Sequence, residues 1–258
     1  MSGHSSFYGK NTKEKHMKLI DIHAHILPGL DDGASGLEES LKMIQMAEKQ
    51  GISAIVATPH HSPQFPNSRQ EVLEAYKRLK EAAAGKSSVQ IFCGQEIFYS
   101  EDSVEQLRAG EQMTMAGSSW ILVEFMPFDP FTRIFQGCSR LLSAGYGIIL
   151  AHVERYDCLR EPAHMEELLR MGVKFQMNFR PIGGAWYGKT TRWCKTMLKE
   201  HKIHFLGTDM HNTDKRSPET QQAISWMRKH LEEEYLHLVC RENAEKILGL
   251  SGSEKLTE

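Results

Sequence analysis

The sequence predicts a single-domain α/β fold in which seven strands close into a (β/α)7 barrel. Three observations support this prediction. Short apolar runs alternate with amphipathic helical stretches, as in βαβ units around a parallel sheet. The runs are apolar throughout, as expected when both faces of a sheet are covered. No G-x-G-x-x-G follows the first run and reactive residues follow many strands, which favours a barrel over an open Rossmann sheet.

The first half of the chain sets the alternation. The stretch KLIDIH (18–23) is predicted to be a strand. Residues 37–51 are predicted to form a helix that ends at a glycine, because Leu37, Leu41, Ile44 and Ala47 recur at helical spacing. The same reading, applied in order along the chain, predicts strands at 53–58, 89–94, 119–125, 147–152, 173–178 and 203–209, and helices at 69–85, 131–145, 165–172, 190–201, 218–232 and 241–248.

Composition restricts the class of protein. The chain has 258 residues, 40% of them apolar, and a formal net charge of −2, which gives no reason to expect nucleic-acid binding. No apolar run is long enough for a bilayer, so we expect no membrane insertion. Residues 1–16 lack the apolar segment of a secretion signal and are expected to be an expression leader or a disordered extension. Residues 17–250 contain no linker or repeat, and 251–258 are expected to be a flexible tail.

The five cysteines are scattered and form no C-x-x-C pair. Without a signal segment, such a set indicates reduced thiols and a cytoplasmic location. A cysteine-phosphatase loop would need an arginine six positions after its cysteine. Those positions hold Tyr99, Ala144, His164, Glu200 and Lys246, which excludes that mechanism.

Metal-binding residue types follow the first strand. His23 and His25 are two apart in an extended segment, so both should point to one face. Asp21, two residues earlier, is a possible third group on that face. The alternative is a pair of hydrogen-bonded histidines near a strand end.

Later strands support the metal interpretation, because five of them end on or are followed by an imidazole or a carboxylate. These residues are His60, Glu96, Glu124, His152, Asp209 and His211. A buried carboxylate or imidazole is costly unless it is paired or bound to metal. Six strands that deliver such groups to one rim therefore predict a multinuclear metal site. Ligands without thiolate suit manganese, iron or zinc in an open catalytic site.

The remaining histidines are not expected to bind metal. His61 is ambiguous because it neighbours His60. His204 opens a strand at the wrong end of the barrel. The others lie in helical stretches or in the first sixteen residues: His164, His201, His230, His237, His4 and His16.

The chain resembles the PHP-class bacterial tyrosine phosphatases of the polymerase-and-histidinol-phosphatase superfamily. The motifs that carry this resemblance are DIHAH, ILPGLDDGA, ATPHH, HVERY and GTDMH. The resemblance covers about residues 17–250, and LPGLDDGA separates this family from the histidinol-phosphatase branch. It implies a PHP-type distorted TIM-like barrel and dependence on manganese. It also implies three metal ions, the first held by His23, His25, Glu96 and Asp209, the second by Glu96, Glu124 and His152, and the third by Asp32, His60 and His211.

Two features depart from the family pattern. Val153 stands where the family usually has proline, and FRPIGG (179–184) is an unusual loop after Asn178 that could change substrate fit. The resemblance also implies a partner, the phosphorylated tyrosine-rich tail of a kinase that controls capsule or exopolysaccharide synthesis.

The chemistry expected of such a site is phosphomonoester hydrolysis, since bound metals lower the pKa of water. Three divalent ions against four ligand carboxylates leave a positive site that favours a phosphate dianion. Arg155 and Arg216 follow His152 and His211 closely and are expected to contact only substrate, holding phosphate oxygens bidentately; a surface salt bridge is the alternative. Asp209 is also a candidate for orienting water or protonating the leaving phenolate.

The sequence therefore predicts a metal-dependent protein-tyrosine phosphatase. Apolar and aromatic loop residues are expected to flank the phenyl ring: Phe65, Phe98, Phe128, Phe131, Trp186 and Tyr187. Two alternatives stay open. One is a phosphoesterase of the same superfamily that acts on a small metabolite such as histidinol phosphate or on a nucleic-acid end. The other is a regulator that keeps the barrel without its chemistry, which would be marked by lost ligands.

Overall fold

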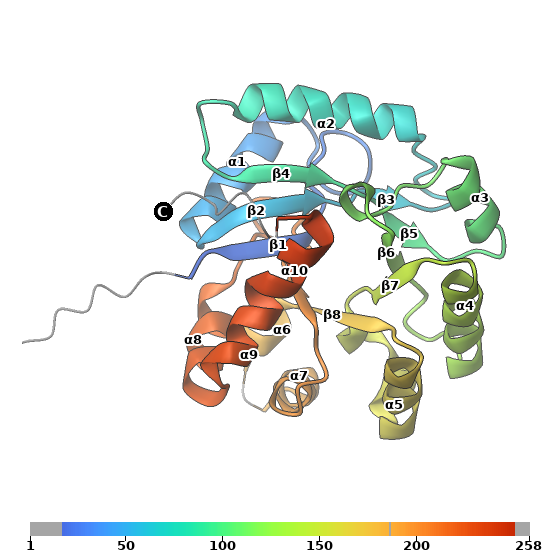
Figure 1. Cartoon of the computed structure of the whole chain (residues 1–258). Helices are drawn as coiled ribbons and strands as arrows, with labels where there is room; N and C mark the ends of the chain where they lie inside the picture. Colours follow the sequence, from blue (N-terminus) through green and yellow to red (C-terminus); the bar gives the residue numbers. More distant parts are fainter. Residues whose placement is uncertain (1–16, 186, 251–258) are drawn as a thin grey trace, which may run out of the picture.

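Parallel strands curl into a barrel with helices around it (Figure 1). The computed structural model describes residues 17–185 and 187–250, so the expectations for 1–16 and 251–258 lie outside the described residues. The strands are β1 (Leu19–Ala24), β2 (Ile52–Ala57), β3 (His60–His61), β4 (Gln90–Cys93), β5 (Glu96–Phe98), β6 (Trp120–Glu124), β7 (Gly147–Leu150), β8 (Lys174–Asn178) and β9 (Phe205–Gly207).

The strand order confirms the barrel. One sheet has the order β1-β2-β4 and the other β3-β5-β6-β7-β8-β9. Only two residues separate β2 from β3, and two separate β4 from β5, so each pair is one strand with a break. A parallel bridge between Ala24 and Met210 joins the end of β1 to the residues after β9. The seven predicted strands therefore form a ring, and their carboxyl ends share one rim.

Helices cover the outside of the ring. They are α1 (Leu37–Lys49), α2 (Arg69–Ala83), α3 (Ser103–Ala109), α4 (Phe131–Ser143), α5 (Pro162–Arg170), α6 (Phe179–Gly183), α7 (Lys189–Lys199), α8 (Gln221–His230), α9 (Glu233–His237) and α10 (Asn243–Leu248). The short helix α3 was not predicted. The expectation of a loop at 179–184 is wrong, because residues 179–183 form α6. Among the described residues, no helix is long and apolar enough to cross a membrane.

Two apolar clusters lie on the two faces of the ring. The larger cluster packs the outer faces of the strands against the helices. The smaller one contains Ile20, Val56, Leu122 and Ile149 from the strands together with Ile247 from α10. In Figure 1, α10 lies across the strands at this end. One end of the barrel is thus filled with apolar side chains, and the polar residues of the strand ends collect at the other.

Candidate metal centre

His23 and His25 point the same way, as the spacing predicts. Both side chains are fully buried, and their Nε2 atoms lie 3.2 Å apart. Asp21 does not join them. The register between β1 and β2 shifts between Asp21 and Ala24, which breaks the two-residue periodicity that the prediction used. The carboxylate of Asp21 accepts hydrogen bonds from the amide and hydroxyl of Thr208 instead.

The carboxylate of Glu96 lies at the centre of the cluster. Its Oε2 is 3.1 Å from His23 Nε2, 3.2 Å from His25 Nε2 and 3.1 Å from His60 Nδ1. Burial alone would raise the pKa of Glu96, but the surrounding imidazoles lower it well below its ordinary value. This buried oxygen forms no hydrogen bond within the described part of the chain. A buried anionic oxygen facing three ring nitrogens fits a shared cation.

Asp209 completes the first group from the end of β9. Its Oδ1 lies 3.6 Å from His23 Nε2 and 3.5 Å from His25 Nε2. The residue has a φ of 53°, and His152 has a φ of 34°. Non-glycine residues rarely adopt this left-handed region, and they do so mostly at functional sites. At Asp209 the bond from its amide to the His23 carbonyl, at 2.8 Å, holds this conformation.

The other predicted ligands lie around the same point. His152 Nε2 is 2.8 Å from Glu96 Oε1 and 3.3 Å from Glu124 Oε2. Asp32 Oδ1 is 3.5 Å from His60 Nε2 and 3.4 Å from His211 Nε2. The structure thus brings together all nine side chains named from the sequence.

The grouping of these ligands differs in detail from the sets implied by the resemblance. Within the part of the chain that the structure describes, three sets have ligand atoms close enough to hold one ion: His23, His25 and Asp209; His60, Glu96 and Glu124; and His25, Asp32, His60 and His211. His60 faces two groups because its Nδ1 points to Glu124, at 3.1 Å, and its Nε2 to Asp32. An imidazole has two nitrogens, so His60 lies between two sets rather than in one.

Asp31 is a site residue that the sequence reasoning missed. Its Oδ2 accepts hydrogen bonds from His25 Nδ1 at 2.7 Å and from the His60 amide at 2.9 Å. Its Oδ1 accepts from the Gly33 amide at 2.9 Å. A carboxylate behind a ligating histidine fixes its tautomer and ring orientation. The pair of adjacent aspartates in LPGLDDGA was the available signal, since one carboxylate could bind a metal ion while the other orients a ligating histidine.

Gln176 and Asn178 on β8 were also missed. Gln176 Oε1 accepts from the His152 amide at 2.7 Å and from His23 Nδ1 at 3.1 Å. Asn178 donates from Nδ2 to Asp209 Oδ2 at 3.0 Å. The signal that could have identified them is the alternation of polar and apolar residues in KFQMN, although this run was predicted as a buried strand. With these bonds, Gln176 links two predicted ligands from different strands.

Both predicted arginines reach the rim. Arg155 pairs with Asp209 Oδ2, and Arg216 donates from Nη2 to Asp209 Oδ1 at 2.8 Å. Arg216 also lies 3.7 Å from Asp32. The expectation that these arginines contact only substrate is therefore wrong. Burial by itself would raise the pKa of Asp209, but His23 and Arg155 hold it below its ordinary value.

Other titratable side chains stay outside the cluster. His61 Nδ1 faces the Asn67 carbonyl, and His204 Nδ1 accepts from the Phe175 amide at the opposite end of the barrel. Burial raises the pKa of the Cys93 and Cys138 thiols to about 12. Such thiols are poor nucleophiles, which agrees with the exclusion of cysteine chemistry. Three other histidines lie in helices and in none of the ligand sets: His164, His230 and His237. His201, expected in a helix, follows the end of α7 with a φ of 55° and is also in none of these sets.

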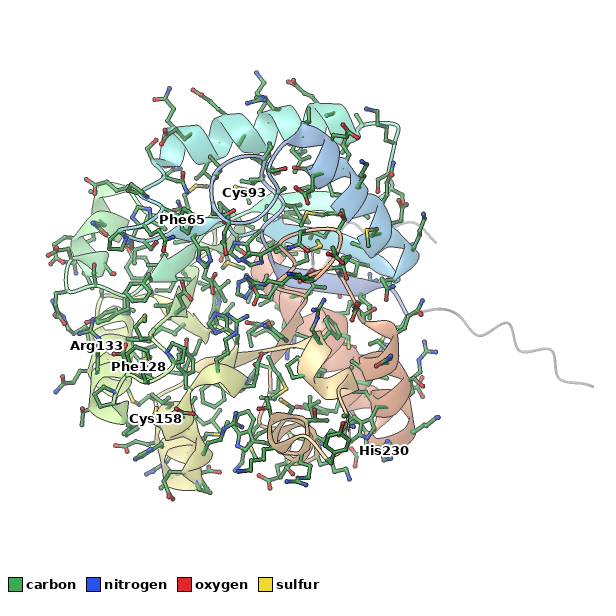
Figure 2. All side chains as sticks on the ribbon, turned by 180° about the vertical axis from the view of Figure 1, so that it is seen from behind. Phe65, Cys93, Phe128, Arg133, Cys158 and His230 are labelled. Carbon is green, nitrogen blue, oxygen red and sulfur yellow. The ribbon has the colours of Figure 1, made fainter. Side chains whose placement is uncertain are left out.

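An apolar cavity opens beside the cluster. It has a volume of about 470 Å³, and Phe65, Phe98 and Pro127 are among its apolar walls. Arg155 and four of the proposed ligands also line it: Asp32, His60, Glu124 and His152. Of the aromatic residues named from the sequence, Phe65 and Phe98 line this cavity. Figure 2 shows Phe65 and Phe128 on one side of the molecule, with His230 at the far edge.

The other aromatic predictions have different outcomes. Phe128 is 72% exposed and Tyr187 is 68% exposed, so neither forms a wall of the apolar cavity. Phe131 stacks on His164 with ring centroids 3.9 Å apart, which makes it part of the α4–α5 packing. Trp186 lies outside the described residues.

A second cavity, of about 530 Å³, lies on the other side of Arg155. We call it the arginine cavity. Pro127 and Arg155 line both cavities, so the two are adjacent. The lining residues of the arginine cavity are Pro127, Glu154, Arg155, Asn178, Arg180, Pro181, Thr190, Thr208, Asp209 and Arg216.

Fold and site together define a TIM-like barrel that gathers imidazoles and carboxylates for divalent metals at the carboxyl ends of its strands. The model of the capsular polysaccharide synthesis family CpsB/CapC matches residues 19–249, and the chain belongs to this family.

Characterised relatives and a solved structure agree with this assignment. The tyrosine-protein phosphatase CpsB of Streptococcus pneumoniae is 32% identical over 82% of this chain and 90% of its own length. YwqE of Bacillus subtilis, also named a tyrosine-protein phosphatase, is 31% identical over 89% of this chain and 91% of its own. A crystal structure from work on YwqE and CpsB, described as unique metal-dependent tyrosine phosphatases, superposes with a TM-score of 0.83. It is 30% identical and covers 90% of this chain and 94% of its own.

Proposed function

We propose that this protein is a metal-dependent protein-tyrosine phosphatase that hydrolyses phosphotyrosine on a bacterial tyrosine kinase of capsule or exopolysaccharide synthesis. The observation that carries the proposal is the buried Oε2 of Glu96, which faces three imidazole nitrogens without a hydrogen bond to any described residue. Membership of the CpsB/CapC family supports it, as does the phosphatase activity in the names of the relatives.

The cluster suits three divalent ions, with manganese the first choice and iron or zinc as alternatives. Imidazole and carboxylate ligands without thiolate fit these metals. Glu96 would hold metal at the centre of the cluster, and the eight other ligands would be His23, His25, Asp32, His60, Glu124, His152, Asp209 and His211. When bound, the ions lower the pKa of water and neutralise charge on the phosphoryl group.

The chain's own residues hold and orient the reacting groups. Arg155 and Arg216 converge on Asp209 at the rim, where their remaining N–H donors can hold phosphoryl oxygens as charge builds up. Asp31 and Gln176 fix the rings of His25 and His23 through their Nδ1 atoms. Each ring then presents Nε2 toward Glu96, so the ligand atoms are preorganised.

The apolar cavity suits the phenyl ring of phosphotyrosine, because Phe65 and Phe98 offer apolar surface next to the cluster. A cavity open at the rim can accept a side chain on an extended peptide. This supports the tyrosine-rich tail of a kinase as the substrate. The cytoplasm is the proposed place of reaction because the cysteines form no C-x-x-C pair and are free.

Turnover of a phosphotyrosine peptide should be compared with turnover of a phosphoserine peptide and of histidinol phosphate. We expect the phosphotyrosine peptide to have the highest kcat/KM. Chelation should abolish this activity and manganese should restore it, while changing all five cysteines to serine should leave most of the rate. A higher kcat/KM for histidinol phosphate would overturn the substrate assignment. Loss of activity in a folded, metal-loaded cysteine-free variant would overturn the mechanism.

A further inference from the structure

The arginine cavity presents positive charge to anything that enters it. The side chains of Arg155, Arg180 and Arg216 are 39%, 43% and 35% exposed. The two acidic residues of its lining are almost fully buried, with Glu154 5% exposed and Asp209 3% exposed. A ligand in this cavity therefore meets little accessible carboxylate, and it meets the guanidinium of Arg180 beside those of Arg155 and Arg216, which are proposed to hold the phosphoryl group.

Arg180 is the member of this set that the metal cluster does not use. One of its terminal nitrogens donates to the Lys215 carbonyl, and the other donates to the Ser217 carbonyl at 3.2 Å. The nearest carboxylate, that of Glu219, is 3.9 Å away and 65% exposed, so it neutralises little of the charge. The guanidinium is thus held in place by backbone carbonyls while further N–H donors stay available.

The same short segment also places Arg216. Arg180 is bonded to the residues on either side of Arg216, whose own guanidinium reaches Asp209. Helix α6 carries Arg180. The second basic group beside the reaction centre is therefore placed by α6 together with residues 215–217.

The position of the cavity indicates which part of a substrate would reach it. A phosphotyrosine ring in the apolar cavity would place its peptide backbone near Pro127 and Arg155, which line both cavities. An extended chain advances about 3.3–3.6 Å per residue. A side chain one to three positions from the phosphotyrosine then lies over the arginine cavity.

We propose that the arginine cavity is a specificity subsite for an acidic side chain, carboxylate or phosphoryl, next to the phosphotyrosine in the same peptide, with Arg180 as its principal contact. This inference rests on the proposed function and names the sequence context of its substrate. Guanidinium groups hold carboxylate and phosphate through paired N–H donors.

The test compares peptides built around one central phosphotyrosine. One peptide has alanine at the three positions on each side, others have a single aspartate at one of these positions, and a last set has a second phosphotyrosine there. At least one acidic peptide should exceed the alanine peptide about fivefold in kcat/KM, mainly through KM, because charge-assisted contacts in a partly exposed site are of this size. The gain should shrink as salt is added.

Variants then locate the contact. Arg180→Gln should bring the ratio between acidic and alanine peptides close to one. Thr190→Glu, which adds a negative charge to the cavity wall without removing the bonds of Arg180, should lower the ratio as well. Arg192→Gln, an exposed arginine on α7 outside the cavity lining, should keep the wild-type ratio.

The outcomes distinguish failure of the proposed subsite from failure of the proposed phosphatase function. Equal kcat/KM for all peptides in the wild type, or an unchanged ratio in both Arg180→Gln and Thr190→Glu, would overturn the subsite. Failure to hydrolyse any of the peptides would instead overturn the proposed function. Thermal unfolding of each variant shows whether the fold is intact, and Thr190→Glu keeps the test decisive if Arg180→Gln does not fold.

Discussion

Replacing Asp31 by asparagine should weaken metal binding, although Asp31 is not counted among the metal ligands. Its side chain is fully buried and accepts three hydrogen bonds, from His25 Nδ1 and from the amides of His60 and Gly33. Burial would raise the pKa of Asp31, but the neighbouring His25 holds it below its ordinary value. Asp31 is therefore anionic near neutral pH and makes the His25 ring a more basic ligand.

The size of the effect follows from these contacts. Asparagine has the same shape but only one acceptor oxygen, so at least one of the three N–H donors would face the NH2 group. Leaving a buried donor unpaired costs about 1–3 kcal/mol, which we expect as lost stability in the chelated protein. Removing a carboxylate behind a ligand typically lowers metal affinity about 10–100-fold.

The assay is a manganese titration of chelated protein, with thermal unfolding in chelator and kcat/KM at saturating metal. The control is Asp102→Asn, since Asp102 is exposed and makes no capping hydrogen bond at the start of α3. Much of the activity of Asp31→Asn should return at saturating manganese. Wild-type affinity for manganese together with wild-type stability would refute the idea that Asp31 orients His25.

The remaining predictions concern the arginines and a histidine outside the site. Arg155→Ala and Arg216→Ala should each lower kcat/KM about a hundredfold, and lysine at either position should restore little of it. Each alanine variant removes a cation beside Asp209, so its affinity for metal should not fall. A loss of bound metal in parallel with the loss of activity would contradict the substrate role. Burial, with the charge of Lys174, lowers the pKa of His204 to about 4. The unfolded chain therefore takes up the proton first as the pH falls below about 6.5. Through this residue, the free energy of unfolding of the wild type should fall by about 2 kcal/mol between pH 7 and pH 5. The free energy of unfolding of the wild type and of His204→Asn should be measured at pH 7 and pH 5, and the variant should not show this decrease. The same pH dependence in both proteins would refute the role of His204.

The ends of the predicted strands were enough to find the ligand residues. A parallel barrel brings the carboxyl ends of all its strands to one rim, so His60, Glu96 and His152 could be expected together although they are far apart in sequence. The two-residue spacing of His23 and His25 set their common direction because side chains alternate between the two faces of an extended segment. These inferences need only the position of a residue along its own strand.

Partners that depend on contacts between distant segments could not be found in this way. Asp21 was assigned to the wrong face because a register shift in β1 interrupts the two-residue period. Asp31 and Gln176 reach the cluster through a loop and a neighbouring strand, and no local period records those contacts. The pairing of Arg155 and Arg216 with Asp209 likewise joins three separate loops.

The sequence by itself determined the class of fold, the strand ends that carry imidazoles and carboxylates, and the family. Periodicity and residue type are local properties, and both can be read along the chain. The tertiary structure decided which nitrogen faces which oxygen, how His60 is placed between two ligand groups, and that α6 sets Arg180 beside Arg216. These depend on differences of an ångström or less between side chains of distant segments, and such distances follow from strand register and loop packing rather than from local pattern.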